Sequence, residues 1–336
     1  MKIKPMTKFA ILALSLVLVA CAGGGSEEAG CPAIDGREIN VVATTPMIGE
    51  FVSQVGGENI NLTVLMPPEA NPHTYEPAPQ DAGTIAEADL VFYTGLLYEP
   101  AALVKLLENS ACSTDILSEV GESVFPIEFK EGGHDDHDDH DDHDDHDDEE
   151  GHDDHEGHNH GAYDPHFWFD PSRVAYAAEY IESRLIQFDP ENESSYISSA
   201  DSFVSELNDL TKQVSELIST VPSQNRKLIT THESLGYLEA KFGLEVLSTI
   251  IPSLNSANEI SPSDLAGVID VIEDNNVKVI FIESEAPSVY SETIVAETGI
   301  KPVTGLYVET LKPGQSYSEF LISNVKLITE NLQDTD

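Results

Sequence analysis

Histidine is the residue of this chain best suited to metal chemistry, and its twelve copies fall into two groups by spacing. Nine lie between residues 134 and 160, where an imidazole recurs about every three residues among aspartates and glutamates. The other three, His73, His166 and His232, are scattered along the chain. Because imidazole binds zinc, copper and nickel, the spacing predicts a tract with several weak metal sites and one specific site built from distant residues. The nine histidines of the tract are His134, His137, His140, His143, His146, His152, His155, His158 and His160.

The tract 131–162 has no apolar residue able to bury itself, so we expect a disordered loop. Three interpretations of it stay open. It is a solvated acidic linker without a role, a low-affinity collector or sensor of excess zinc, or a binder of copper or nickel. As a collector it would raise the local metal concentration near a specific site to which it is tethered.

The net charge of −45 argues against a nucleic-acid partner, because phosphates would be repelled. Fifteen of the 61 acidic residues lie within residues 134–160. The remaining acidity suits the attraction of cations, although solubility alone also explains it.

The rest of the chain alternates between short β-branched runs and amphipathic helical patterns. Expected strands lie at 39–45, 60–66, 90–93, 227–231, 244–250 and 277–282, with short strands near 302–308. Expected helices lie at 47–55, 79–88, 100–108, 172–187, 234–242, 261–273, 288–297 and 316–332. This alternation predicts an α/β fold of two related lobes, each a mostly parallel sheet flanked by helices.

One longer helix is expected at 189–222, ended by Pro222. Its apolar residues recur at intervals of three and four and form one stripe. At 1.5 Å per residue it spans roughly 45 Å, more than one small lobe needs. We therefore expect it to link a lobe at 38–188 to a lobe at 223–336. The stripe consists of Phe203, Leu207, Leu210, Val214, Leu217 and Val221.

Residues 1–20 have the pattern of a secretory signal peptide, with early lysines and an apolar run at 9–20 that is too short to span a bilayer. Its end, Leu-Val-Ala-Cys, resembles the prokaryotic lipobox, which implies cleavage before Cys21 and a diacylglycerol thioether on the Cys21 sulfur. A plain secretory signal with an incidental cysteine is the alternative. Residues 21–37 would form a flexible tether, and the lipid would anchor the protein to the cell membrane on its extracytoplasmic side.

With Cys21 lipidated, Cys31 and Cys112 are the remaining cysteines. Outside the cytosol such a pair can form a disulfide, which would join the tether to the first lobe. Neither stands in a CxxC motif, so a redox or cysteine-based zinc site is not expected.

Ligands of open α/β sheets bind beyond the carboxyl ends of the strands, so residues that follow predicted strands are candidates. His232 comes directly after a predicted strand, and His73 lies in the loop after another. Glu309 follows a short predicted strand, whereas His166 opens a helix after the tract. A site in the cleft between the lobes would collect these residues.

Three segments around the histidines resemble signature segments of one protein family. They are Asn-Pro-His-Thr-Tyr-Glu-Pro at 71–77, Asp-Pro-His-Phe-Trp-Phe-Asp-Pro at 164–171 and Thr-His-Glu-Ser-Leu-Gly-Tyr at 231–237. The family is that of the zinc/manganese substrate-binding proteins of ABC uptake transporters, in the cluster with a rigid linking helix. The resemblance covers about residues 38–332 and includes the segment 280–285.

By this resemblance His73, His166 and His232 are imidazole ligands, and Glu309 is the fourth ligand, at a position where many relatives have aspartate. Glu285 is the alternative fourth ligand. Three imidazoles and one carboxylate suit tetrahedral Zn(II), whereas manganese prefers more oxygen. Manganese members resemble this chain but carry glutamate at the position of His232. Zinc members often carry a histidine-rich loop where this chain has its tract.

The resemblance implies a protein that captures Zn(II) as its transported ligand and delivers it to an ABC transporter permease, and we expect a monomer. Manganese or another divalent metal is the alternative substrate. A zinc metalloenzyme is the rival from another class. However, the residues after His232 and Glu233 break the HExxH pattern, and four protein ligands leave no position for water. A metal-binding adhesin or a metal buffer without a transporter also stays open.

Overall fold

The computed structural model describes residues 31–333 except 32, 35, 69, 130–162 and 286–288. The signal peptide, Cys21, most of the tether and the whole histidine tract lie outside these residues, so their interpretation stays a prediction. Within the described part, no helix combines the length and the apolar character needed to cross a bilayer.

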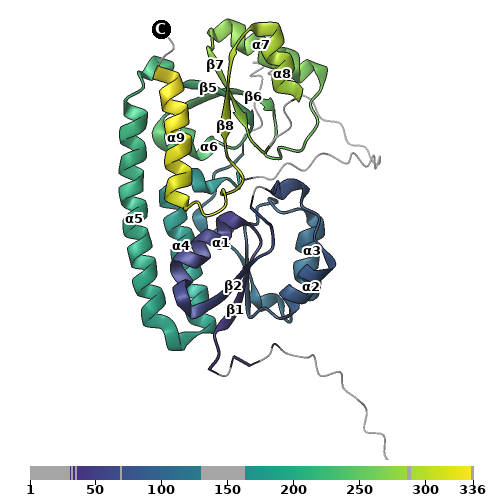
Figure 1. The fold of residues 1–336 in the computed structure, drawn as a ribbon, viewed down its shortest axis with the longest axis vertical. Coiled ribbons are helices and arrows are strands. Elements are labelled where there is room, and N and C mark those ends of the chain that lie inside the picture. Colours follow the sequence, from purple (N-terminus) through teal and green to yellow (C-terminus); the bar gives the residue numbers. More distant parts are fainter. Residues whose placement is uncertain are drawn as a thin grey trace, which may run out of the picture. The chain divides into compact units, whose positions relative to one another are not determined.

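The amino-terminal half of the chain forms a four-stranded parallel sheet in the order β2-β1-β3-β4 (Figure 1). Its strands are β1 (Ile39–Ala43), β2 (Ile60–Val64), β3 (Leu90–Tyr93) and β4 (Leu117–Glu119). Its helices are α1 (Pro46–Gly56), α2 (Pro79–Ala86) and α3 (Ala101–Ser110). Figure 1 shows α1 on one face of the sheet and α2 and α3 on the other. The sequence does not predict β4, which is three residues long with one apolar residue.

The carboxy-terminal half repeats this topology in a second parallel sheet, in the order β6-β5-β7-β8. Its strands are β5 (Lys227–His232), β6 (Glu245–Ile251), β7 (Val279–Glu283) and β8 (Lys301–Leu306). Its helices are α6 (Gly236–Phe242), α7 (Pro262–Asn275), α8 (Val289–Thr298) and α9 (Tyr317–Gln333). In both sheets the first strand lies between the second and the third, so the two halves are topologically alike. The α/β fold class predicted from the sequence is confirmed.

Most of the predicted strands end one or two residues away from the predicted position, and two of these ends lie close to candidate ligands. β5 runs one residue further and includes His232 as its last residue. β8 is a single strand that ends at Leu306, before Glu309 is reached. It ends there because the buried side chain of Asn324 on α9 forms hydrogen bonds with both the amide and the carbonyl of Tyr307.

The short helix that His166 opens is a 3-10 helix and not the following α-helix. His166 precedes a 3-10 turn at Phe167–Phe169, and α4 (Pro171–Phe188) begins only after that turn. Asp170 caps α4, because its carboxylate accepts a hydrogen bond from the Ser172 amide at 2.9 Å. The turn buries three aromatic side chains, and this packing fixes the backbone next to His166.

One apolar core runs beneath both sheets. Helix α5 (Glu193–Ser219) packs against α1, α4 and α9, and Figure 1 shows it running alongside both halves of the chain. The core that it joins includes Phe92 of β3 and Phe281 of β7. Separate apolar clusters cover the other face of each sheet. Because the shared core crosses the expected boundaries at 188 and 222, the exact division into lobes and a linking helix stays an interpretation.

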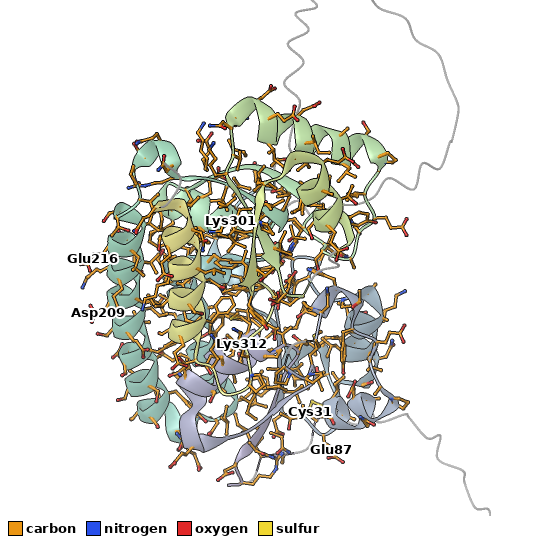
Figure 2. The ribbon with its side chains drawn as sticks, turned by 45° about the horizontal axis from the view of Figure 1, so that its top comes forward. Cys31, Glu87, Asp209, Glu216, Lys301 and Lys312 are labelled. Carbon is orange, nitrogen blue, oxygen red and sulfur yellow. A yellow bond between two sulfur atoms is a disulfide. The ribbon has the colours of Figure 1, made fainter. Side chains whose placement is uncertain are left out.

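From Phe203 to its end, the buried stripe of α5 differs from the predicted one at a single position, and Val221 of the predicted stripe is buried beyond the end of the helix. Ile218 is buried, whereas Leu217 is only half-buried. At 3.6 residues per turn both positions lie at about the same angle from the centre of the stripe, so spacing alone does not choose between them. The opposite side of the helix carries exposed charges such as Asp209 and Glu216 (Figure 2).

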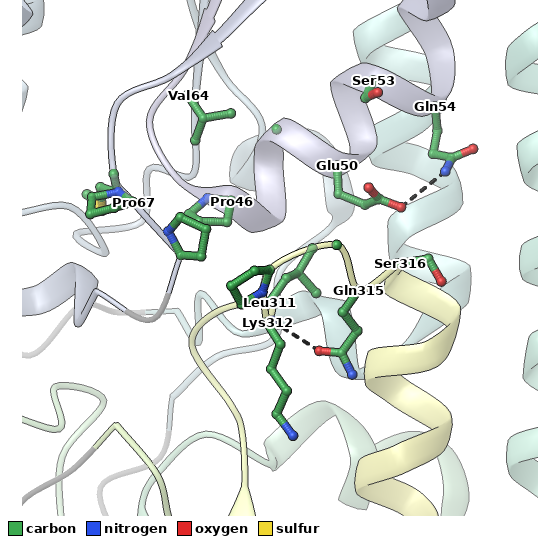
Figure 3. A pocket seen from close by; sticks show the side chains of 15 residues that line it. Pro46, Glu50, Ser53, Gln54, Val64, Pro67, Leu311, Lys312, Gln315 and Ser316 are labelled. Carbon is green, nitrogen blue, oxygen red and sulfur yellow. Dashed lines mark hydrogen bonds between the residues drawn. The ribbon is translucent and has the colours of Figure 1, made fainter.

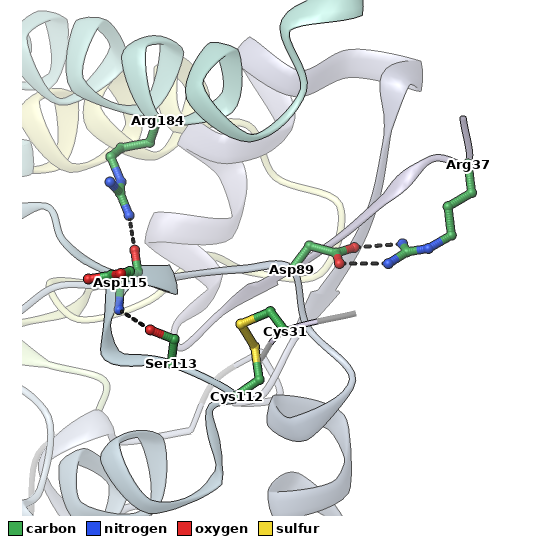
Figure 4. Close-up of a disulfide and its surroundings, with 7 residues drawn as sticks. All are labelled: Cys31, Arg37, Asp89, Cys112, Ser113, Asp115 and Arg184. Atoms are coloured by element: carbon green, nitrogen blue, oxygen red, sulfur yellow. Dashed lines mark hydrogen bonds and ion pairs between the residues drawn. A yellow bond between two sulfur atoms is a disulfide. The ribbon is translucent and has the colours of Figure 1, made fainter. Parts of the chain in front are cut away.

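Two links fix the amino-terminal end of the described chain to the first sheet (Figure 4). A disulfide joins Cys31 to Cys112, the pair that the sequence analysis considered. Arg37 forms a bidentate ion pair with the buried carboxylate of Asp89, with both N–O distances at 2.6 Å. Asp89 also accepts a hydrogen bond from the Asn40 amide at 2.7 Å. Both links lie at the amino ends of the strands.

Replacing Leu210 by alanine should lower the free energy of unfolding by about 2–5 kcal/mol, the usual effect of a cavity in a packed core. This α5 side chain is 2% exposed and belongs to the shared core. Chemical denaturation followed by circular dichroism measures the change. Asn208→Ala, at an exposed position of the same helix, is the control and should change stability by less than about 0.5 kcal/mol. Equal losses in the two variants would contradict the packing described here.

Candidate metal centre

Four side chains that are far apart in sequence meet near the carboxyl ends of the strands. His73, His166, His232 and Glu309 each offer one nitrogen or oxygen atom, and these four atoms all lie within 4.8 Å of one another. All four side chains are buried, His73 being 3% exposed and the others 0%. The structure thus brings together, from both halves of the chain, the residues that the resemblance named as ligands.

The imidazoles surround the carboxylate of Glu309. Its Oε1 atom lies 3.0 Å from Nε2 of His73 and 2.9 Å from Nε2 of His232. Its Oε2 atom lies 3.5 Å from Nε2 of His166. The Nε2 atoms of His166 and His232 are buried and have no aligned hydrogen-bond partner among the described residues. Unpaired nitrogen atoms turned toward a buried carboxylate are a donor set that suits a cation.

A carboxylate behind His166 sets the orientation of its ring. Asp164 Oδ1 lies 2.8 Å from His166 Nδ1, and it accepts a hydrogen bond from the His166 amide at the same distance. Gly236 allows this arrangement, since a Cβ atom there would lie 2.7 Å from Asp164 Oδ2. With Nδ1 paired to Asp164, Nε2 is the nitrogen left for a metal ion.

His232 is supported in the same way. Its Nδ1 atom lies 2.5 Å from Oε2 of Glu283, the last residue of β7. The other oxygen of Glu283 accepts hydrogen bonds from the His232 amide at 3.1 Å and from the Thr230 hydroxyl at 2.9 Å. Neither Glu283 nor Asp164 is predicted from the sequence as a site residue. The position of Glu283 at a strand end could have identified it, and Asp164 stands within a motif segment.

Glu309 is held from both halves of the chain. The hydroxyl of Tyr98, in the loop after β3, donates to Glu309 Oε2 at 2.9 Å and lies 3.1 Å from the Glu309 carbonyl oxygen. Glu285 Oε1 accepts the amides of Val308 and Glu309 at 3.2 and 3.3 Å. Trp168 Nε1 donates to the Val308 carbonyl at 2.8 Å. Tyr98 is not predicted from the sequence as a site residue, although its place after a predicted strand was a signal that could have identified it.

The alternative fourth ligand, Glu285, is not part of the four-residue group. Its carboxylate supports the backbone that carries Glu309. Burial raises the pKa of Glu285 to about 8, and the charges of Glu309 and Glu283 act in the same direction. Because Glu285 lies outside the group of four and one of its oxygens is engaged by two backbone amides, the geometry favours Glu309 for the fourth position.

The loop that carries His73 is tied to the other half of the chain. The His73 amide donates to the side-chain oxygen of Asn71 at 2.9 Å. The side-chain amide of Asn71 in turn donates to Ser256 Oγ at 3.0 Å and to the Glu285 carbonyl at 3.3 Å. The two halves therefore meet through this loop as well as through Glu309.

A pocket of about 550 Å³ is separate from the metal group (Figure 3). Pro46 and Glu50 of α1 line it, together with Leu311, Lys312 and Gln315 from the chain that follows Glu309. None of the four grouped side chains is among its lining residues. The metal-binding chemistry of the described residues therefore belongs to the closed cluster of imidazoles and not to this pocket.

Sequence comparison relates the chain that carries this metal-binding group to a known family. Residues 41–331 match the family model described as ZnuA, zinc-uptake complex component A periplasmic. The chain belongs to the ZnuA family. Members of this family are metal-binding, substrate-binding proteins of ABC transporters, which work with a permease and an ATPase and are not enzymes.

Relatives of this ZnuA-family chain are named for different metals. It is 28% identical over 334 residues to the high-affinity zinc uptake system protein ZnuA of Bacillus subtilis, covering 96% of each chain. It is 26% identical over 339 residues to the manganese ABC transporter substrate-binding lipoprotein PsaA of Streptococcus anginosus, covering 98% of this chain and 99% of the relative. These names alone do not decide between zinc and manganese.

Solved structures share the fold. The periplasmic zinc-binding protein TroA from Treponema pallidum superposes with a TM-score of 0.73 at 21% identity, covering 88% of this chain and 99% of TroA. Fe(III)-bound YtgA from Chlamydia trachomatis gives a TM-score of 0.72 at 25% identity, covering 88% and 98%. The family resemblance inferred from the sequence is thus confirmed by both the family model and the fold.

In this ZnuA-family site the carboxylates change the protonation of the imidazoles. Burial lowers the pKa of His166, but the charges of Glu309 and Asp164 outweigh it and raise the pKa to about 9. Burial likewise lowers the pKa of His232, but Glu283 and Glu309 raise it well above its usual value. Burial raises the pKa of Glu309, but the three imidazoles hold it well below its usual range. At neutral pH the metal-free site therefore carries protons that must leave when a metal binds.

Metal affinity should rise with pH up to about 9, because protons on His166 and His232 compete with the metal below that pH. The apparent dissociation constant should fall by about tenfold per pH unit for each proton displaced. Calorimetric zinc titrations at neutral pH in two buffers of different ionisation enthalpy count the released protons, with a chelator titrated in the same buffers as control. Unchanged affinity between about pH 6 and about pH 9, without proton release, would contradict this assignment.

Proposed function

We propose that this protein captures Zn(II) outside the cytoplasm and delivers it to the permease of an ABC transporter, with His73, His166, His232 and Glu309 as the ligands. The observation that carries the proposal is the buried group of three imidazole nitrogens and one carboxylate within 4.8 Å of one another. Such a set can surround one tetrahedral zinc ion at about 2.0–2.2 Å. It leaves no open coordination position, which suits transport of the ion rather than catalysis on it.

The donor types support zinc over manganese. Zinc accepts three imidazoles and one carboxylate, whereas manganese favours more oxygen donors. The nearby carboxylates of Asp164 and Glu283 add no oxygen to the group, because each is turned to the Nδ1 atom of a histidine. Manganese is the alternative substrate, since relatives such as PsaA of Streptococcus anginosus are named for it.

Two further features support a location outside the cytoplasm. The disulfide between Cys31 and Cys112 suits an oxidising compartment. The lipobox-like segment before Cys21 and relatives named as lipoproteins support a lipid on Cys21 that anchors the protein to the cell membrane. All four proposed ligands come from one chain, so a monomer is a sufficient functional unit.

Release of zinc would come from loop movement rather than from rotation of the two halves. The shared core beneath both sheets opposes rotation, because rotation would break close packing. The His73 loop and the Glu309 segment are joined to the opposite half by hydrogen bonds, among them those of Asn71 and Tyr98. Docking on the permease would open the site by displacing these bonds.

Alanine at His73, His166 or His232 should weaken zinc binding at least about 100-fold, because a residue that merely supports a ligand already contributes about 10- to 100-fold. Competition with a fluorescent zinc chelator measures affinity, and elemental analysis gives metal content. Glu233→Gln is the matched control, since Glu233 follows His232 but its carboxylate accepts a hydrogen bond from Thr249. Near-wild-type affinity would exclude the substituted histidine as a ligand. Tighter binding of manganese than of zinc by the wild type would favour the manganese alternative.

The tract at 134–160 is proposed as an accessory collector with weak zinc sites. Its composition supports this role, because a flexible chain with regularly spaced imidazoles can fold several of them onto one ion. The described residues on its two sides are joined by an antiparallel bridge between Glu128 and Tyr163. Metal caught on the tract would therefore be held close to Asp164 and the histidine that Asp164 supports.

Deleting 134–160 should remove the weak zinc sites and leave one tight site, because the four proposed ligands lie outside the tract. Isothermal titration calorimetry resolves the two classes of site. A second variant, with the nine tract histidines changed to asparagine and the acidic residues kept, separates imidazole binding from simple charge. Loss of the tight site on deletion would contradict the assignment, as would weak sites that persist in the asparagine variant.

A further inference from the structure

The two oxygen atoms of the Glu309 carboxylate have different surroundings. Oε1 faces two imidazoles, at 3.0 Å from His73 Nε2 and 2.9 Å from His232 Nε2. Oε2 accepts a hydrogen bond from the Tyr98 hydroxyl at 2.9 Å and lies further from the third imidazole, at 3.5 Å from His166 Nε2. One oxygen is thus directed at the nitrogen donors, while the other is engaged by a phenol.

The hydroxyl of Tyr98 is fixed in place by packing. The side chain is 1% exposed. Its ring stands edge-on to His73, with centroids 5.0 Å apart, and to Trp168 at 5.3 Å. The same hydroxyl lies 3.1 Å from the carbonyl oxygen of Glu309, so it approaches the backbone and the carboxylate of that residue together. Tyr98 therefore has little freedom to turn away from Glu309.

The loop behind Tyr98 is also held firmly. Leu96 and Leu97 both have left-handed backbone conformations, with φ of 53° and 62°, which residues with a Cβ atom adopt only where their surroundings impose it. Two carboxylates hold the loop in place. Glu99 accepts two backbone amides of the loop, and Glu119 accepts a third. The position of the phenol is thus set by the amino-terminal half, while Glu309 comes from the carboxy-terminal half.

We propose that Tyr98 is a specificity-determining residue that holds Glu309 Oε2 and leaves Oε1 as the single oxygen available to the metal. A carboxylate can bind a metal through one oxygen or through both. Restricting Glu309 to one keeps the site at four donors, which suits zinc and disfavours manganese, because manganese prefers more oxygen donors. Tyr98 acts through Glu309 and is not itself a ligand. This inference rests on the proposed function, since it concerns the choice of metal at the same site.

Tyr98→Phe tests the inference, because it removes the hydroxyl and keeps the ring. The ratio of the manganese to the zinc dissociation constant, measured by chelator competition, should fall at least about tenfold, the effect of losing one hydrogen bond to a charged group. X-ray absorption of the zinc-loaded proteins should show one carboxylate oxygen in the wild type and two in the variant. Tyr196→Phe is the matched control. It removes another buried hydroxyl, which is hydrogen-bonded to Asp189. It should leave the ratio of the two dissociation constants and the number of zinc-bound carboxylate oxygens unchanged.

Several outcomes would overturn the inference. The inference is wrong if zinc in the wild-type protein is bound by two carboxylate oxygens. This measurement needs no variant, so it tests the inference even if Tyr98→Phe fails to fold. The inference is also wrong if the ratio of the manganese to the zinc dissociation constant is the same in Tyr98→Phe as in the wild type. This holds whether both affinities stay the same or both weaken equally, since equal weakening indicates a purely structural role. Failure of the proposed function is distinguishable, because wild-type protein would then bind no zinc or would bind it independently of His166.

Discussion

The carboxylate of Glu309 is buried among three imidazoles, and the polar contacts of the metal centre follow from the need to stabilise it. A charge removed from water is strongly destabilising unless opposite charge and hydrogen bonds compensate for it. Imidazoles and the Tyr98 hydroxyl supply that compensation at close range. Two of the imidazoles are in turn paired with further carboxylates, those of Asp164 and Glu283. Imidazoles and carboxylates thus alternate through the site, and a divalent cation can bind among them when it displaces the protons of the imidazoles.

The same centre depends on packing, because its members come from both halves of the chain. The shared core fixes the position of one sheet relative to the other, so the segments that carry the four donors need little reorganisation to bind a metal ion. Family members such as this one are therefore expected to change shape mainly in loops. Hydrogen bonds of Asn71, Tyr98 and Trp168 close the centre between the two halves, in contrast to the extensive apolar contacts beneath it.

Much of the fold could be predicted from the sequence, because β-branched runs and helical periodicity report burial directly. The strand β4 was not predicted, since Leu117–Glu119 has too few apolar residues to give a pattern. The histidines could be found because few residue types bind zinc and each lies in a distinctive segment. The supporting residues were harder to find. Glu283 ends an apolar strand and Tyr98 is one aromatic residue among many, so their roles depend on distances that no local pattern contains.

The links at Cys31 and Arg37 have a mechanical consequence. Both join the chain to the first sheet at the amino ends of its strands, whereas the metal centre lies near the carboxyl ends. A pull transmitted through Cys31 would load the disulfide and the buried ion pair with Asp89 before it reached any ligand loop. A force applied to the chain at Cys31 would therefore be borne at one end of the sheet, and the metal centre near the other end would be mechanically isolated from it.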